Sequence, residues 1–133
     1  MANRLPVVNR LRPRISNQGI VDLEAISRRV SKNTTFNPAE ILSVLKQFTD
    51  EANAAIQAGE IVKIDGLVNI APNMKVGGEV GMSLRGDRKA IAGLNDPTLW
   101  TAAKVANHDN LGRTSEELVL LWNEEHPEDT VVD

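Results

Sequence analysis

Apolar side chains recur with a helical period in the first half of the chain. In residues 21–31, Leu23, Ile26 and Val30 fall on one stripe, and Asp22 precedes the stripe as a good N-cap. Basic residues follow at the end of this stretch, where cations suit the helix dipole. The pattern predicts a first helix here.

A second, stronger helix signal follows directly. Asn37 suits an N-cap, Pro38 suits the first helical position, and Glu40 completes a capping box. Gly59 supplies a C-terminal stop. The sequence therefore predicts a helix from Pro38 to Ala58. One of its faces carries Ile41, Leu45, Phe48, Ala52 and Ile56.

The apolar period changes to two in residues 61–70. Val62 and Ile64 alternate with Lys63 and Asp65, which predicts a strand. Gly66 in its middle indicates a bulge or a close backbone approach. Residues 74–93 are glycine-rich and basic, and they suit two further strands joined by a mobile hairpin.

The two ends of the chain differ in pattern. Pro6 and Pro13 argue against a regular helix in residues 1–19, which leaves an edge strand or a flexible basic arm. A cap followed by proline predicts a short helix over residues 97–106. Thr114 and Glu117 form a capping box that opens a last helix, ending near residue 125.

Charge divides the chain in the same way. Residues 1–104 hold fourteen Lys and Arg against ten Asp and Glu, whereas residues 105–133 hold one Arg against eight acids. The acidic end contains Glu116, Glu117, Glu124, Glu125, Glu128, Asp129 and Asp133. Such an acidic end is a solvated helix face and tail, a segment that competes with DNA for a basic surface, or a surface that binds a basic partner. The basic body has the charge to meet a polyanion, but the whole chain, with its net charge of −3, is not built to bind one strongly.

Several classes of chemistry find no support in the sequence. There is no cysteine, no nucleophile with a neighbouring base and no phosphate loop, and His108 and His126 lack acidic ligands at metal spacing. We expect a non-enzyme without cofactor or metal. No apolar run reaches the roughly 20 residues of a membrane helix, so a cytoplasmic protein is expected. Trp100 and Trp122 are expected to anchor a core or a dimer interface.

The segment after the second helix resembles the HU/integration-host-factor family of dimeric DNA-binding proteins. Gly59, Val62, Ile64 and Gly66 match the family pattern that follows its helix-turn-helix pair. Leu67-Val68 replaces the family's Phe-Gly, and Ile70 replaces its second aromatic residue. The family's Arg-Asn-Pro arm tip is absent. Its proline is the wedge that kinks DNA, so we expect weak or no kinking.

This resemblance implies an α+β fold of the HU type. A helix-turn-helix pair precedes a small antiparallel sheet with a β-arm and C-terminal helices, and two chains intertwine as a dimer. We assign residues 1–19 to a basic N-terminal arm or edge strand, 20–106 to the HU-like domain, and 107–133 to an acidic C-terminal helix and tail.

The first functional hypothesis is an architectural, largely non-sequence-specific DNA-binding homodimer, which condenses DNA in a bacterial nucleoid. The residues expected at DNA phosphates are Lys63, Lys75, Arg85, Arg88 and Lys89 on the β-arm side, with Arg10, Arg12 and Arg14 as auxiliary contacts. The residues expected in the dimer interface are Ile41, Leu45, Phe48, Ala52 and Ile56.

The second hypothesis is an HU-like fold reused as a structural or assembly subunit, for example in a virion if the chain is phage-encoded. The basic arm and the acidic C-terminal helix then dock other proteins. The net charge of −3 and the lost arm tip favour this alternative. A DNA mimic that uses the acidic tail is a third option, for which the tail has few charges.

Overall fold

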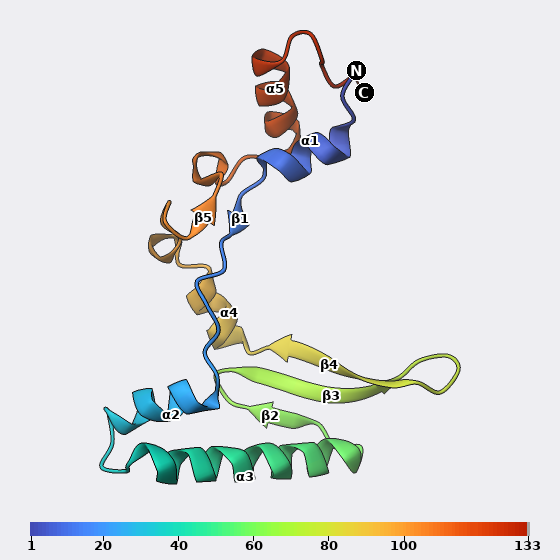
Figure 1. The fold of residues 1–133 in the computed structure, drawn as a ribbon. Coiled ribbons are helices and arrows are strands. Elements are labelled where there is room, and N and C mark those ends of the chain that lie inside the picture. Colours follow the sequence, from blue (N-terminus) through green and yellow to red (C-terminus); the bar gives the residue numbers. More distant parts are fainter. Residues whose placement is uncertain (133) are drawn as a thin grey trace. The chain divides into compact units, whose positions relative to one another are not determined.

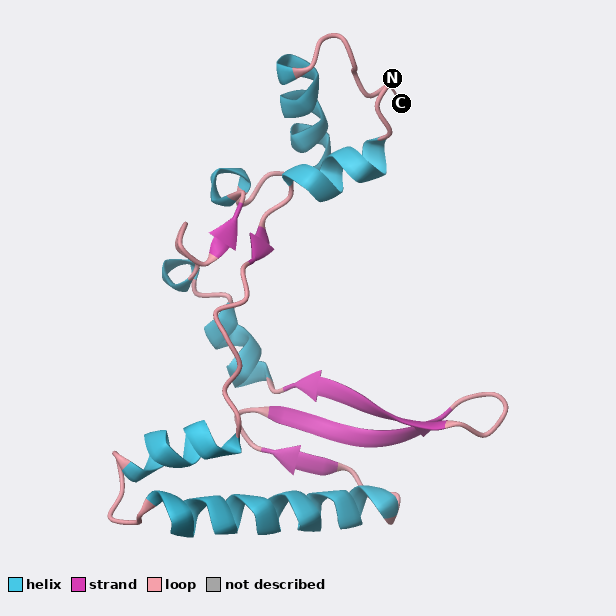
Figure 2. Ribbon diagram, in the orientation of Figure 1, coloured by secondary structure: helices cyan, strands magenta, loops and turns pink. Residues whose placement is uncertain are grey.

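The computed structural model describes residues 1–132 and divides into two compact units, drawn as ribbons in Figures 1 and 2. The central unit holds residues 19–96, and the terminal unit joins residues 1–18 to residues from 97 onward. The contacts thus group the two ends of the chain, whereas the sequence-based division kept them apart. Asp133, counted in the acidic end, lies outside the described residues.

The central unit places a helix pair before a three-stranded antiparallel sheet. Its elements are α2 (Leu23–Ser31), α3 (Pro38–Gln57), β2 (Val62–Ile64), β3 (Val68–Met74), β4 (Val80–Gly86) and α4 (Arg88–Leu94). The strands lie in the order β2-β3-β4. Helix α2 packs on α3, and α3 contacts β2 and β3, as Figure 1 shows. The α+β class expected from the sequence is confirmed.

Side-chain caps begin both helices of the pair where the sequence predicted. The Asp22 carboxylate accepts a hydrogen bond from the backbone N–H of Ala25 at 2.8 Å. The Asn37 side chain accepts from the N–H of Glu40 at 2.9 Å, and Pro38 occupies the first turn. These caps satisfy backbone donors that have no partner inside the helix.

The predicted single strand over residues 61–70 is wrong at its centre. The N–H of Leu67 donates to the carbonyl of Ile64 at 2.9 Å, which closes a tight turn between β2 and β3. Gly66 has a φ of +82°, as the third residue of a type II turn requires. The glycine therefore reverses the chain rather than forming a bulge.

The terminal unit is built from short elements around one small core. They are α1 (Arg4–Leu11), β1 (Arg14–Ile15), a 3-10 turn (Pro97–Leu99), β5 (Val105–Ala106), a second 3-10 turn (His108–Asn110) and α5 (Ser115–Glu125). Helix α1 packs on α5, and β1 pairs with β5. The core joins Val7 of α1 to Val119 and Trp122 of α5 and to Val131 of the tail.

The expected edge strand or flexible arm at the N-terminus is a helix in the structure. Pro6 lies in the first turn of α1, where a missing backbone N–H removes no intrahelical bond. Val7 is thereby turned into the core, with only 4% of its surface exposed. The position of a proline, rather than the number of prolines, decides whether this segment forms a helix.

The structure differs from the sequence-based prediction at two further places, before and after residue 97. The helix predicted over residues 97–106 is limited to the 3-10 turn, because Val105 pairs with Ile15 and is buried in that pairing. Helix α4 was missed, although Asp87 caps it by accepting from the N–H of Lys89 at 2.9 Å. By contrast, Thr114 caps α5 as predicted.

Asparagine side chains tie the tail and the loops of the terminal unit together. Buried Asn110 donates to the carbonyl of Leu11 at 2.7 Å. Asn123 accepts from the N–H of Val131 at 2.7 Å and donates to its carbonyl at 3.3 Å. Asn123 thus pairs with the tail as a neighbouring strand would.

No helix within residues 1–132 combines the length and the apolar character needed to cross a membrane.

We predict that Asn123→Ala lowers the free energy of unfolding of the terminal unit by about 1–3 kcal/mol, because the buried backbone groups of Val131 lose their partners. Both tryptophans of the chain lie in this unit, so tryptophan fluorescence during urea unfolding measures its stability alone. Asn9→Ala on the exposed side of α1 is the matched control, with a change below about 0.5 kcal/mol. Equal effects of the two substitutions would contradict the role given to Asn123.

Candidate nucleic-acid interface

The register of the central sheet separates its side chains into one polar and one apolar face. Lys63 of β2 lies opposite Asn69 of β3, and Asn69 lies opposite Arg85 of β4. Residues directly opposite each other point to the same side of a sheet. Lys63, Asn69 and Arg85 therefore form one row across all three strands, which we call the basic row.

The basic row is open to solvent and carries two positive charges. Lys63 and Arg85 are exposed, and within residues 1–132 neither forms an ion pair. Two strand spacings place their backbones about 10 Å apart. Asn69 lies between them, with amide groups that both donate and accept hydrogen bonds. The row is thus suited to groups that carry separated negative charges, such as phosphates.

Polar side chains extend this face toward the end of the β3–β4 hairpin. The Asn73 side chain donates to the hydroxyl of Ser83 at 2.7 Å across the two strands. Sequence reasoning missed Asn69, Asn73 and Ser83. The signal was present, because Asn69 and Asn73 alternate with apolar residues along β3.

The opposite face of the sheet is apolar and faces α3. Its residues are Val62, Ile64, Val68, Ile70, Pro72, Val80, Met82 and Leu84. Ile56 of α3 shares a hollow with Pro72, Val80 and Met82 at the edge of this face. The basic row therefore points away from α3.

The hairpin end carries no excess of positive charge. The N–H of Lys75 donates to the carbonyl of Glu79 at 2.8 Å, and Gly77 and Gly78 form the turn with φ of +104° and +92°. Lys75, which was predicted to contact DNA, lies at this end of the hairpin. The negative charge of Glu79 offsets its positive charge. Val76 at the turn is fully exposed.

Arg88 and Lys89 do not lie on the arm. They begin α4, and the capping residue Asp87 alone separates them from the end of β4. The prediction that the β-arm carries these two cations is wrong, because the hairpin closes at residues 75–79 and β4 ends at Gly86. Among the predicted arm residues, Arg85 alone belongs to a hairpin strand.

The auxiliary arginines belong to the terminal unit. Arg10 lies over the ring of Trp122 at 5.7 Å, a cation–π distance. Arg12 caps the end of α1, and Arg14 lies in β1 opposite Ala106. Of the eight residues predicted to contact DNA, five therefore lie in the central unit and three in the terminal unit.

Charge is distributed unevenly along the central unit. Residues 61–96, which hold the sheet and α4, contain five basic and four acidic residues. Residues 19–60, which hold the helix pair, contain four basic and six acidic residues. The sheet segment is consequently the more positive part of a unit that is almost neutral.

Both histidines contact tryptophan residues of the terminal unit. Nε2 of His108 lies 3.0 Å from the carbonyl oxygen of Trp100, and His126 stacks on Trp122 with 3.7 Å between ring centroids. Across residues 1–132 no three His, Asp or Glu side chains are grouped to hold a metal ion.

Comparison with known proteins identifies a family for this chain. No curated protein matches the chain. The family described as an HU domain fused to wHTH, Ig or glycine-rich motif, HU-HIG, matches residues 4–80, which is more than half of the chain. The match includes the helix pair, β2, β3 and the start of β4, and it confirms the resemblance to HU proteins. The chain therefore belongs to the HU-HIG family of HU-domain proteins.

Proposed function

We propose that this protein is an architectural DNA-binding protein that acts as a homodimer, with little preference for sequence. The observation that carries the proposal is the basic row, whose Lys63 and Arg85 are exposed on the sheet face opposite α3. Family membership supports the same role and a place in the bacterial nucleoid.

The apolar surface of the central unit supports the homodimer. Ile56 is its one buried hydrophobic residue, at 8% exposure, while Phe48 is 48% exposed and Leu84 67% exposed. A unit of this size needs a larger buried core to be stable. A second copy of the unit supplies the missing contacts.

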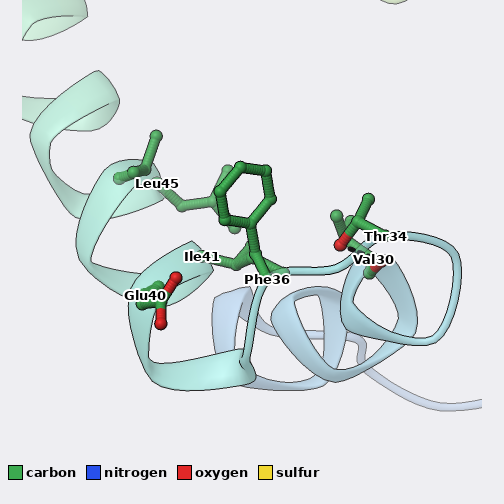
Figure 3. Close-up of a pocket in the computed structure, with 7 residues that line it drawn as sticks. Val30, Thr34, Phe36, Glu40, Ile41 and Leu45 are labelled. Atoms are coloured by element: carbon green, nitrogen blue, oxygen red, sulfur yellow. Dashed lines mark hydrogen bonds between the residues drawn. The ribbon is translucent and has the colours of Figure 1, made fainter.

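The predicted interface residues lie along one side of α3. Ile41, Leu45, Phe48, Ala52 and Ile56 are spaced by three or four residues, so they share a helix face. Beside them is an apolar cleft of about 560 Å³, shown in Figure 3. Phe36 projects from the α2–α3 connection between Ile41 and Leu45 on one side and Val30 and Thr34 on the other. A side chain of the second copy is expected in this cleft.

We predict that Val44→Glu weakens the dimer at least about tenfold, because Val44 lines the apolar cleft and the substitution places a charge there. Val44 is 68% exposed in the single chain, so the substitution disturbs little of its own packing. Light scattering over a dilution series should show the wild type at twice the chain mass of 14.5 kDa. Ser43→Glu, an exposed neighbour on another side of α3, is the control and should stay dimeric. A monomeric wild type would contradict the proposed dimer.

Charge neutralisation is the proposed mechanism of DNA binding. Lys63 and Arg85 occur twice in a homodimer and meet phosphates, which gives affinity without base readout. The hairpin turn contains no proline, so weak or no kinking of the duplex is expected. The acidic helix pair lies on the other side of the sheet, where it does not oppose the duplex directly.

We predict that replacing Lys63 and Arg85 by Gln flattens the salt dependence of binding to a 40-base-pair duplex. If all four cations of the dimer neutralise one phosphate each, the slope of log K against log[salt] falls by about 3.6. The control is Lys46→Gln on α3, which changes the same kind of charge away from the basic row. The affinity is measured by fluorescence anisotropy across a salt series.

The competing candidate is an assembly subunit that docks proteins instead of DNA. The near-neutral central unit and the Lys75–Glu79 hairpin end favour it. Absence of duplex binding by the wild type at low salt would reject DNA binding and support this candidate. An unchanged slope in the double variant would instead reject the basic row as the contact surface.

A further inference from the structure

A second exposed apolar surface lies in the terminal unit, where β1, β5 and the adjoining turns form a shallow groove. We call it the terminal groove; its lining is Pro13, Arg14, Ile15, Trp100, Val105 and Leu111. Its volume is about 190 Å³, a size for one aliphatic side chain. Ile15 is 66% exposed and Leu111 is 48% exposed, so both present apolar surface to solvent.

Basic residues lie in and next to the chain segments that line the terminal groove. Arg14 lines the groove. Arg12 directly precedes the lining residue Pro13, and Arg113 lies shortly after the lining residue Leu111 in the sequence. All three are exposed, and within residues 1–132 none of them is in an ion pair. Residues 1–18 and 97–113 together contain six basic residues and one acid, Asp109. An occupant of the groove is therefore expected to be apolar at its centre and acidic around it.

The outer side of α5 has the complementary character. Leu120 is 62% exposed, and Glu116, Glu117 and Glu124 stand three or four residues from it on the same helix side. Residues 114–132 contain six acids and no Lys or Arg. We call these four residues the α5 outer face.

Within the α5 outer face, Leu120, Glu117 and Glu124 point away from the packing of α5 on α1, whereas Glu116 lies at its edge. Leu118, Val119 and Trp122 are buried on the inner side, where α5 packs on α1. Arg4 forms an ion pair with Glu116 at 2.7 Å at the edge of that packing. A backbone hydrogen bond and this arginine hold the pKa of Glu116 below its ordinary value, which keeps the carboxylate charged. Leu120 is thus left open to solvent.

We propose that the α5 outer face of one copy docks in the terminal groove of a second copy, with Leu120 in the groove and the glutamates against its arginines. Charge complementarity and the match of one aliphatic side chain to the groove select a second copy as the occupant. Because two different surfaces meet, the contact is heterologous and joins successive copies head to tail. The inference concerns the terminal unit and does not depend on DNA binding by the central sheet.

Cross-linking through single cysteines tests this contact in the full-length chain without DNA. The natural sequence has no cysteine, so Leu111→Cys and Leu120→Cys each provide one defined thiol. The two variants, distinguished by a tag on one of them, are mixed and oxidised mildly. We expect the mixed 111–120 disulfide at least about tenfold in excess over the product of a control pair, Leu111→Cys with Leu5→Cys. Leu5 is exposed on α1 at 71%, outside both surfaces.

Charge reversal separates specific docking from random collision. Arg14→Glu in the Leu111→Cys variant should reduce the mixed product, and raised salt should reduce it as well, because exposed charges are screened. A mixed product no greater than that of the control pair would overturn the proposal. Predominant 120–120 cross-links would also overturn it, since they indicate a symmetric contact between two α5 helices.

Discussion

The pairing register of β3 with its two neighbours decides what the central unit presents to solvent. Because side chains alternate along a strand, Val68 and Ile70 turn toward α3 while Asn69 turns away from it. A slip of one residue would place Lys63 and Arg85 against the helix and the aliphatic residues in water. The turn at Gly66 and the hairpin at Gly77-Gly78 fix this register at both ends of β3. The candidate nucleic-acid surface is therefore a consequence of strand pairing.

The two units differ in how completely they satisfy their own apolar surface. The terminal unit encloses Val7, Val119, Trp122 and Val131, and asparagine side chains pair its loops and tail. The central unit leaves most of its helix and sheet side chains partly exposed. The terminal unit thus buries a small core of its own, whereas the central unit exposes the apolar surface from which the homodimer is proposed. Each unit nevertheless leaves apolar surface open, and the proposals for a second copy rest on the cleft beside Phe36 and on the terminal groove.

Local signals predicted the helix pair of the central unit and α5 of the terminal unit, but not the rest of the terminal unit. The caps at Asp22, Asn37 and Thr114 act over three residues, so the sequence alone placed three helices. The terminal unit depends on contacts between the two ends of the chain, such as that of Val7 with Trp122, which no local pattern contains. The same applies to Val105, whose partner Ile15 lies far away in sequence.

The candidate site was predicted in part for the same reason. Lys63 and Arg85 were identified as basic strand residues, but their common row required the register of three strands. Arg88 and Lys89 were assigned to an arm because the helix cap at Asp87 was not recognised in the glycine-rich segment.

Lysine acetylation measured residue by residue, with and without a bound duplex, tests the central claim most directly. The basic row predicts that DNA slows acetylation of Lys63 while Lys46 on α3 reacts at an unchanged rate. Equal rates at Lys63 with and without saturating duplex would contradict the claim that this face of the sheet binds DNA.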